Sequence, residues 1–315
     1  MVLPHYPIID WPPTALIAAG ALLVDWLVGE PSRFHGLVGF GRLASLLEAR
    51  LNPPPQQSQV NQRLYGLLGV AILLIPLALA AWWLCHLPIL GPIADLLLLY
   101  FAIGHRSLHE HAQAVLVPLQ AGDLAAARQA ASHMVSRDLA AIEPVSATVE
   151  SVLENGNDGI FGALLWFFIA GGAGALTFRL VNTLDAMWGY RSPRFHYFGW
   201  SAAKLDDLLG YLPARLTALT YALLGNTRSA FNCWKRQAST WDSPNAGPVM
   251  AAGAGALSIR LGGPARYQGR WHERPPLGIG ELPHAADIGQ ALALVTRGVY
   301  LWLAAALLVE VLLYA

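Results

Sequence analysis

Residues 159–178 read GIFGALLWFFIAGGAGALTF and contain no Asp, Glu, Lys or Arg. A helix needs roughly 20 apolar residues to cross the hydrocarbon core of a bilayer, so this stretch is long enough to cross. Its glycine-rich centre, Gly171-Gly172-Ala173-Gly174, could instead bend the chain back on itself as a re-entrant hairpin. The two interpretations place the flanking residues either on opposite faces of the membrane or side by side.

Other apolar runs extend this pattern along the chain. Residues 64–94 lack any charged side chain, although their prolines should kink or end a helix there. Residues 14–29 and 298–315 are also apolar, and each run contains a single carboxylate, Asp25 and Glu310 respectively. Such runs predict membrane-spanning helices, because soluble cores are built from shorter apolar segments.

The composition agrees with a membrane protein. Of 315 residues, 55% are hydrophobic and 13% are charged, whereas soluble domains are about 25% charged. The net charge of zero offers no global attraction to nucleic acid. Two distant cysteines, Cys85 and Cys233, exclude a disulfide framework and a zinc motif built from cysteine alone.

We therefore predict an all-α, polytopic integral membrane protein with about four to six membrane elements and helical polar loops. Residues 1–315 form a single membrane-embedded domain in this interpretation, since neither a linker nor a shift in composition divides the chain. Weaker membrane candidates are residues 96–104, 216–225 and 243–259, the last of them re-entrant or packed against other helices. The polar loops are at about 30–63, 104–158, 179–215, 226–242 and 260–290.

The arginines of the first polar loop suggest an orientation. Residues 30–63 carry Arg33, Arg42, Arg50 and Arg63, which the positive-inside rule places in the cytoplasm, with the N-terminus outside. Later loops also carry arginines, so the rule does not orient the rest. No basic residue precedes Arg33, which argues against a cleaved signal peptide.

Three carboxylates lie directly before the 159–178 stretch. Glu150, Glu154 and Asp158 are spaced four residues apart, which puts them on one face if a helix continues through them. Like charges at this spacing destabilise a helix unless a cation lies between them. Mg²⁺ prefers oxygen ligands and bridges to phosphates, and Asn155 and Asn157 could add neutral oxygens. A solvated polar face at a helix end is the alternative interpretation.

Polar residues also follow the 159–178 stretch. The first three, spaced i, i+3 and i+6, are Arg179, Asn182 and Asp185, and Arg191 and Arg194 come after them. They either form a ridge that binds phosphate or carboxylate, or anchor a helix end at the interface. If residues 159–178 cross the bilayer, Asp158 and Asn182 cannot share a site. Only a hairpin, bent near Gly171-Gly172, or a meeting inside the membrane brings them together.

Two other regions are candidates for binding anions. Arg137 either pairs with Asp138 or faces an anionic ligand while Asp138 orients it. The stretch 260–270 mixes glycines with arginines, including Arg266 and Arg270, and exposed backbone N–H groups beside guanidinium groups suit a phosphate. The chain has no G-x-x-x-x-G-K-[ST] motif, so a nucleotide site would be unconventional.

Three histidines lie close together in the sequence. His105 and His109 would share one face of a helix, with His111 nearby, and this spacing permits zinc. The H-E-x-x-H motif is absent, and we favour histidines at a helix interface over a metal site.

These motifs resemble those of the CobD/CbiB family, the adenosylcobinamide-phosphate synthases of bacterial inner membranes. The resemblance spans nearly the whole chain and is most specific between residues 137 and 191. Departures such as His35-Gly36 for the usual His-Pro, and Asn157 for Ser, affect loop stiffness more than chemistry. The densest matches are Val135-Ser136-Arg137-Asp138-Leu139, Glu150-Ser151-Val152, Glu154-Asn155, Asp158-Gly159, Asn182-Thr183-Leu184-Asp185-Ala186-Met187 and Gly189-Tyr190-Arg191.

The resemblance implies an ATP-dependent ligase of cobalamin biosynthesis that requires Mg²⁺. Its substrates would be adenosylcobyric acid and (R)-1-amino-2-propanol or its O-phosphate, which it would join through an amide bond to give adenosylcobinamide (phosphate). We expect an acyl phosphate intermediate, because a free carboxylate is a poor acylating group. The resemblance also implies a multi-pass protein of the inner membrane with a cytoplasmic active site, and other membrane enzymes of late cobalamin assembly as partners.

Residue roles follow from the resemblance together with the spacing. The metal ligands would be Glu150, Glu154 and Asp158. The catalytic residues would be the same three acids with Asn182 and Asp185. The substrate- and phosphate-binding residues would be Arg137, Asp138, Asn155, Arg191, Arg266 and Arg270.

Two other functions remain alternatives. A transporter of a small anionic or corrinoid solute would suit the broken Pro/Gly segments and the intramembrane Asp25 and Glu310. The hydropathy pattern shows no inverted repeat, which such a transporter would be expected to have. A non-catalytic membrane sensor related to the synthases is the second alternative, and retention of the acidic cluster together with residues 182–185 argues against it.

Overall fold

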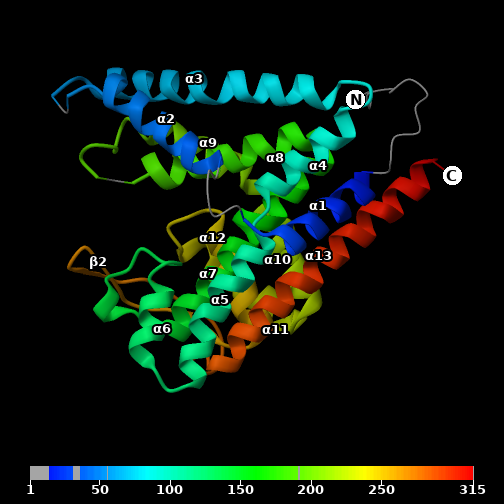
Figure 1. Cartoon of the computed structure of the whole chain (residues 1–315). Helices are drawn as coiled ribbons and strands as arrows, with labels where there is room; N and C mark the ends of the chain where they lie inside the picture. The colour runs from blue at the N-terminus through cyan, green and yellow to red at the C-terminus, as the bar shows by residue number, and fades with distance from the viewer. Residues whose placement is uncertain (1–13, 31–35, 55, 191, 315) are drawn as a thin grey trace.

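The computed structural model describes residues 14–30, 36–54, 56–190 and 192–314. Helices dominate these residues, which confirms the predicted all-α membrane class (Figure 1). The helices are α1 (Thr14–Val28), α2 (Gly36–Leu51), α3 (Gln59–Cys85), α4 (Gly91–Ala102), α5 (His105–Gln120), α6 (Leu124–Ala131), α7 (Pro144–Gly156), α8 (Gly162–Trp188), α9 (Trp200–Leu209), α10 (Tyr211–Leu224), α11 (Thr227–Gln237), α12 (Ala246–Leu257) and α13 (Ala285–Tyr314).

Three helical stretches of the described chain are long and apolar enough to cross a membrane: Gln59–Cys85, Pro144–Trp188 and Ala285–Leu313. Two shorter apolar helices, α1 and α12, accompany them, in agreement with the predicted four to six membrane elements. Most of α3 and the C-terminal half of α13 leave their large apolar side chains exposed. In a soluble protein such surfaces would cause aggregation, whereas lipid tails can cover them.

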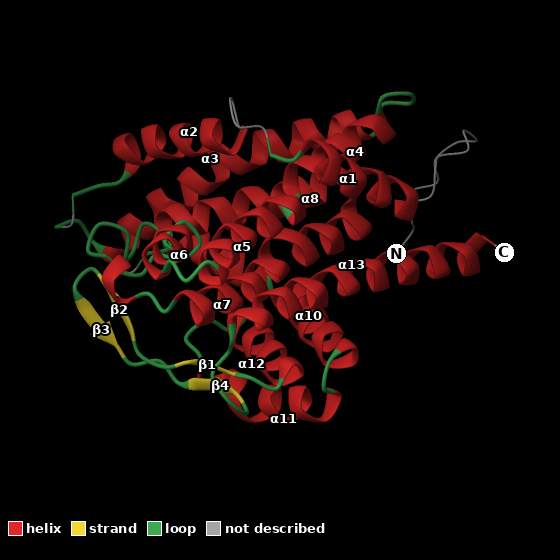
Figure 2. Ribbon diagram, turned by 60° about the horizontal axis from the view of Figure 1, so that its bottom comes forward, coloured by secondary structure: helices red, strands yellow, loops and turns green. Residues whose placement is uncertain are grey.

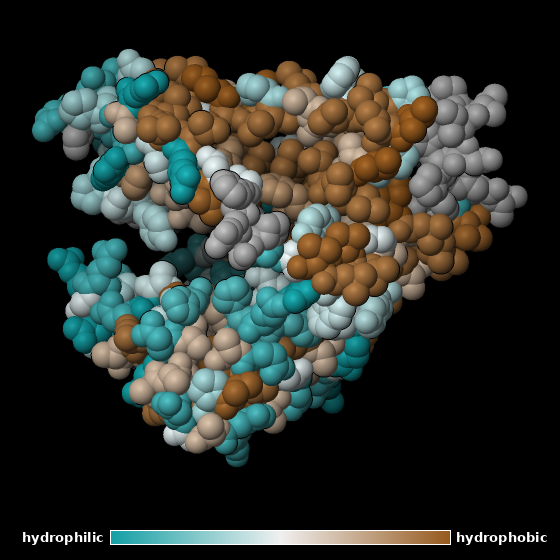
Figure 3. All heavy atoms as spheres, in the orientation of Figure 1, coloured by the Kyte–Doolittle hydropathy of each residue, from teal (hydrophilic) through white to brown (hydrophobic). Residues whose placement is uncertain are grey.

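The helices form two parts (Figure 1). In the upper part of this view, α3 lies along α2, α8 and α9, with α4 packed against α8. In the lower part, α7 contacts α5, α6, α12 and α13. Figure 3 shows that the upper part of this face is mostly hydrophobic, that the lower part is mostly hydrophilic, and that the surface is hollowed between them.

The 159–178 stretch does not cross as one straight helix. Ala170 has φ −140° and ψ 21°, and Gly171 has φ 64° and ψ −161°, so the helical path breaks inside α8. A Cβ built on Gly162 would lie 2.2 Å from the Phe178 ring, so these two residues touch. A straight helix would separate them by about 24 Å at 1.5 Å per residue. The chain therefore folds back on itself, as the hairpin interpretation requires.

A carboxylate from a neighbouring helix stabilises this bend. The Oδ1 atom of Asp95, on α4, accepts a hydrogen bond of 2.6 Å from the backbone N–H of Gly172. The bend leaves this N–H without a helical partner, and an unpaired backbone donor in an apolar setting is costly. Asp95 thus acts as an N-cap, supplied from another helix, for the second half of α8.

Four short strands form in the 260–290 loop, which is an exception to the predicted helical polar loops. β1 (Arg260–Gly262) pairs antiparallel with β4 (Pro276–Gly278), and β2 (Ala265–Tyr267) with β3 (Arg270–His272) (Figure 2). Glycines with positive φ, among them Gly262, Gly263 and Gly269, make the tight turns that connect these strands.

Other sequence expectations are refined by the structure. Pro76 lies inside α3 and does not end it. The helix ends instead at Cys85, within the apolar run. The 243–259 stretch forms α12, which is buried along most of its length against other helices, as one of the two interpretations proposed.

We expect Gly171→Ala to destabilise the protein by about 1–3 kcal/mol, since the φ/ψ values of Gly171 are strained for any residue with a Cβ. The new Cβ would also lie 2.9 Å from Asp95 Oδ1 and disturb the cap. Thermal unfolding in detergent measures the effect. Gly289→Ala on α13 is the matched control, because a Cβ there meets nothing within 4 Å. Equal melting temperatures for the two variants would contradict the role of the bend.

Candidate active site

The candidate site lies where α7 passes into α8, at the junction of the two parts of the molecule. Glu150 and Glu154 are on α7, and Asp158 lies in the π-helical turn Asn157–Phe161 that follows. Glu154 interacts electrostatically with Glu150 on one side and Asp158 on the other. The predicted line of three neighbouring acids is therefore present, with a π-turn of the kind often found at functional sites.

Glu150 is fully engaged by protein groups. Its carboxylate accepts hydrogen bonds from Arg137 Nη2, from Arg274 Nη1 at 2.9 Å and Nη2 at 3.2 Å, and from the Gly262 backbone N–H at 3.1 Å. The Glu150 side chain is only 5% exposed. This ion-pair group joins α7 to the strand region and to the loop before α7.

The expected metal ligand set is not assembled in this arrangement. Within the described ranges, no three His, Cys, Asp or Glu side chains are placed to hold one metal ion. For Glu150 the reason is clear, because two guanidinium groups occupy the carboxylate oxygens that a cation would need. Glu154 and Asp158 remain as neighbouring acids that do not share these ion pairs.

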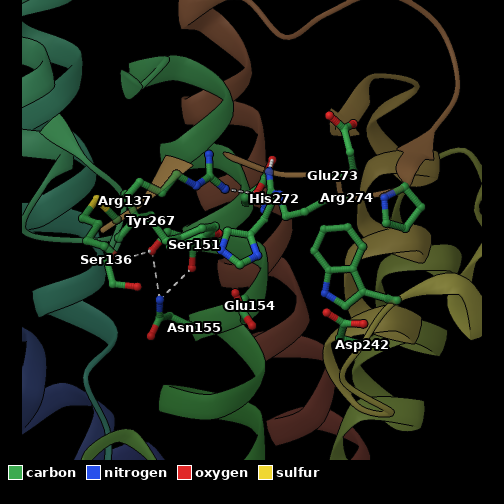
Figure 4. Close-up of a pocket in the computed structure, with 15 residues that line it drawn as sticks. Ser136, Arg137, Ser151, Glu154, Asn155, Asp242, Tyr267, His272, Glu273 and Arg274 are labelled. Carbon is green, nitrogen blue, oxygen red and sulfur yellow. Dashed lines mark hydrogen bonds and ion pairs between the residues drawn. The ribbon is translucent and has the colours of Figure 1, made fainter. Parts of the chain in front are cut away.

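A cavity of about 430 Å³ opens beside these acids (Figure 4). Glu154 lines it, and although this residue lies deep in the fold its side chain is exposed to the cavity. Asn155, one turn from Ser151, donates hydrogen bonds of 2.9 Å and 3.0 Å to the Ser151 carbonyl and hydroxyl. Other polar residues around the cavity are Ser136, Arg137, Asp242, Tyr267, His272, Glu273 and Arg274.

The hairpin brings the second predicted motif to the first. Asp158 interacts electrostatically with Arg179 and with Asp185, both on the returning half of α8. Asn182 Nδ2 donates a hydrogen bond of 3.4 Å to Asp206 Oδ1, and Asp206 in turn interacts with Asp158. The bend thus lets residues from both sides of the apolar stretch share one polar region.

Asp206, on α9, carries the signature of a crowded acidic site. The pKa of Asp206 is raised to about 8, first by burial and then by the nearby carboxylates Asp158 and Asp185. A group so perturbed in a polar cleft is a functional candidate, because binding a cation there would relieve the repulsion.

Several predicted residues lie elsewhere. The Asp138 carboxylate pairs with Arg266 Nε at 3.3 Å and accepts from the Gly269 N–H at 2.8 Å, which fixes the β2–β3 turn. Arg266 and the exposed Arg270 lie outside the residues that line the cavity, so the structure does not bring them to it. The predicted anion-binding Arg191 lies outside the described residues, as does His35.

Sequence reasoning missed Arg274, Tyr267 and His272. They come from the strand region, more than a hundred residues after α7, and nothing in their spacing connects them with Glu150. The arginine-rich 260–270 stretch did indicate that this loop contributes to the site, but it pointed to arginines within the stretch itself. Arg274 also lies over the Trp241 ring, with 5.2 Å between the guanidinium carbon and the ring centroid, a contact visible only in three dimensions.

The histidines form a helix interface, as favoured from the sequence. His105 Nε2 and His109 Nε2 lie 3.2 Å and 3.1 Å from Thr296 Oγ1 on α13, and both rings contact Trp26. Burial lowers the pKa of His105 to about 4, so this ring is neutral at physiological pH. His111 bonds instead to the Ser107 carbonyl of its own helix, so the three histidines do not converge on one ion.

We expect Asp206→Asn to make the protein more resistant to unfolding, with a gain that grows as the pH rises. The folded state retains the Asp206 proton up to about pH 8, whereas the unfolded state releases it near pH 4. The free energy of unfolding therefore falls as the pH rises between these values, and asparagine removes this loss. Melting temperatures in detergent at pH 5, 6, 7 and 8 measure it.

Glu281→Gln, at an exposed position, is the control for the pH series and should track the unsubstituted protein. If the difference between Asp206→Asn and the unsubstituted protein stays constant from pH 5 to 8, Asp206 does not have a raised pKa.

Comparison with known proteins places the chain in one family. The model of the family described as CobD/Cbib protein matches residues 18–295. "Cobalamin biosynthesis protein CobD" of Chromobacterium violaceum is 53% identical over 307 residues, covering 96% of this chain and 98% of the relative. The protein of the same name from Stutzerimonas stutzeri is 53% identical over 291 residues, covering 91% and 95%. That from Mycobacterium tuberculosis is 37% identical over 294 residues, covering 90% and 92%.

No solved structure matches the chain. The family match extends from α1 into α13 and includes both halves of the hairpin and all of the cavity residues named above. The chain belongs to the CobD/CbiB family and has a role in cobalamin biosynthesis.

Proposed function

We propose that this protein is an ATP-dependent amide ligase that joins adenosylcobyric acid to (R)-1-amino-2-propanol or its O-phosphate. The observation that carries the proposal is that the Glu154 carboxylate faces one polar cavity together with Arg137 and Arg274, with the acidic Asp158 next to it. Family membership supports a role in cobalamin biosynthesis, and the polar cavity at the membrane boundary supports chemistry on a charged substrate.

The proposed reaction has two steps. In the first, an oxygen of the corrinoid carboxylate attacks the γ-phosphorus of ATP, the bond to the β–γ bridging oxygen breaks, and ADP leaves. In the second, the amine nitrogen attacks the acyl carbon, phosphate leaves with the electrons of the C–O bond, and the nitrogen gives up a proton. Both steps depend on alignment and on neutralising phosphate charge.

Glu154 fits a role in holding a cation. Its carboxylate faces the cavity, and none of the described residues forms a hydrogen bond or ion pair with it. Asp158 is its nearest acidic neighbour on the other side from Glu150. These two residues would hold Mg²⁺ together with phosphate oxygens, and the bound ion would neutralise phosphate charge.

The arginine pair fits a role in binding phosphate. Arg137 and Arg274 share one partner, Glu150, so the group keeps a net positive charge and lines the cavity. Glu150 holds the two guanidinium planes in place, which reduces the rearrangement needed when an anion binds. We assign Glu150 a positioning role here in place of a metal-binding one.

The size of the cavity limits what it can enclose. About 430 Å³ suits a phosphate chain or a small amine, and a corrin macrocycle is larger than that. We infer that only the reacting carboxylate arm of the corrinoid enters, while the ring stays in the open hollow at the junction of the two parts. An apolar face beside a polar hollow suits a large amphiphilic substrate that approaches along the membrane surface.

We also infer that the protein lies in the inner membrane with this site facing the cytoplasm. ATP is available on that side, and the arginine-rich 30–63 loop points to the same orientation. The bilayer and the two small-molecule substrates are then its partners, together with other membrane enzymes of late cobalamin assembly.

Glu154→Gln should lower ATP-dependent amide formation by at least about 100-fold, since losing a charged metal ligand or its equivalent removes several kcal/mol of transition-state stabilisation. The assay uses membranes or purified full-length protein with adenosylcobyric acid, the amine, ATP and Mg²⁺, and follows product by chromatography. Chelation of Mg²⁺ should abolish the unsubstituted protein's activity.

Glu281→Gln serves again as the matched control, because it makes the same chemical change at an exposed site. Melting temperature in detergent checks that Glu154→Gln remains folded. A folded, fully active Glu154→Gln protein would remove Glu154 from the site.

A further inference from the structure

A second, smaller cavity of about 240 Å³ adjoins the first. The two share Met134, Ser151 and Asn155 in their walls, so a molecule in one lies next to a molecule in the other. The second cavity extends from this shared wall toward the start of α5 and the returning half of α8. Its position between the hairpin and α5 makes it a product of the α8 bend.

Among the described residues that line this cavity, Arg179 is the only arginine. Its Nε atom is buried and has no hydrogen-bond partner among the described residues. Glu30 and Asp158 act on the guanidinium electrostatically, yet neither forms an ion pair with it. A cation held deep in a protein without bonded partners is costly unless a ligand supplies acceptors.

The backbone around Arg179 leaves space for such a ligand. A Cβ built on Gly159 would lie 3.9 Å from Arg179 Nη1 and meet nothing else within 4 Å. The Gly159 carbonyl accepts a hydrogen bond of 3.1 Å from the Gly104 N–H, at the residue that precedes α5. The first turn of α5 therefore faces the same cavity, and the N-terminus of a helix favours an anion.

A carboxylate lies on the other side of the hydrogen-bonded pair formed by Gly104 and Gly159. Glu30 Oε1 would be 3.3 Å from a Cβ on Gly104, so the Glu30 carboxylate lies over Gly104 while the Arg179 guanidinium lies over Gly159. The cavity thus offers one positive and one negative group across a short distance. A small molecule with an anionic group at one end and an ammonium at the other matches this arrangement.

We propose that this cavity is the subsite for the amine substrate and that Arg179 binds the phosphate group of its O-phosphate ester. This rests on the proposed ligase function and adds a residue that selects the phosphorylated amine over the free amine. Glu30 then holds the ammonium end. Because Ser151 and Asn155 belong to both cavities, the bound amine is next to the cavity in which the carboxylate is activated.

The phosphate groups of a nucleotide are the other anions that Arg179 could bind. The small volume argues against a nucleoside triphosphate here, and Arg137 and Arg274 already serve the larger cavity. The two arginine groups are therefore expected to act on different substrates, which mutation can separate.

The test measures equilibrium binding of (R)-1-amino-2-propanol O-phosphate, of the free amine and of inorganic phosphate to purified full-length protein by calorimetry. ATP and corrinoid are left out, so the result does not depend on the reaction. Arg179→Gln should weaken binding of the phosphorylated amine by about 10- to 100-fold, the usual effect of losing a charge-assisted hydrogen bond. Binding of the free amine should change less than about threefold.

Gly159→Ala provides a second variant that keeps the charge, since its Cβ narrows the space beside Arg179 without a clash. Gly159→Ala should also weaken binding of the phosphorylated amine more than binding of the free amine. Arg236→Gln, at an exposed position on α11, is the control and should bind both as the unsubstituted protein does.

Steady-state kinetics add a second readout. With Arg179→Gln, the KM for the phosphorylated amine should rise while the KM for ATP stays constant, and Arg274→Gln should show the reverse. The assignment would be overturned if Arg179→Gln lowered the affinity for both amines equally, or if it raised the KM for ATP. If the unsubstituted protein binds the phosphorylated amine but makes no amide, the ligase function fails while the subsite stands.

Discussion

The structure depends on one hydrogen bond between a carboxylate and a backbone amide. Asp95 on α4 accepts from the Gly172 N–H and so satisfies the donor that the bend at Ala170 and Gly171 leaves without a helical partner. In an apolar environment that donor would otherwise cost several kcal/mol, enough to favour a continuous helix. With the bend, the two halves of α8 lie together and the residues at their polar ends meet.

That meeting creates the site. A continuous helix would place Asp158 and Asn182 on opposite faces of the bilayer, whereas the hairpin links them through Asp206. The result is a row of acids from Glu150 to Asp206 with arginines at intervals along it: Arg137 and Arg274 at one end and Arg179 near the other. Like charges held this close repel one another unless cations intervene, so the row is suited to binding Mg²⁺ and phosphate together.

The two cavities divide this row by chemistry. In the larger one, Glu150 holds two arginines in position while Glu154 keeps its oxygens free. In the smaller one, Arg179 has space beside it, and its Nε has no hydrogen-bond partner in the described part of the chain. Each cavity is too small for a macrocycle, and the shared wall of Ser151 and Asn155 keeps their contents adjacent. The proposed joining of a large amphiphilic acid to a small polar amine would use such a division between an open hollow and enclosed subsites.

The membrane class, the apolar helices and the acidic row could be predicted from the sequence alone, because hydrophobic runs and four-residue spacing are local properties of the chain. It also named the glycines at which the hairpin bends, but both a crossing and a bend satisfied the local pattern. The choice between them depends on a long-range contact, since the partner that stabilises the bend, Asp95, lies 77 residues away from Gly172. The same holds for Arg274, which reaches Glu150 across 124 residues, and for the use of Glu150 as an ion-pair partner. Long-range contacts of this kind leave no periodic signal, so three-dimensional packing alone could show which acids remain free.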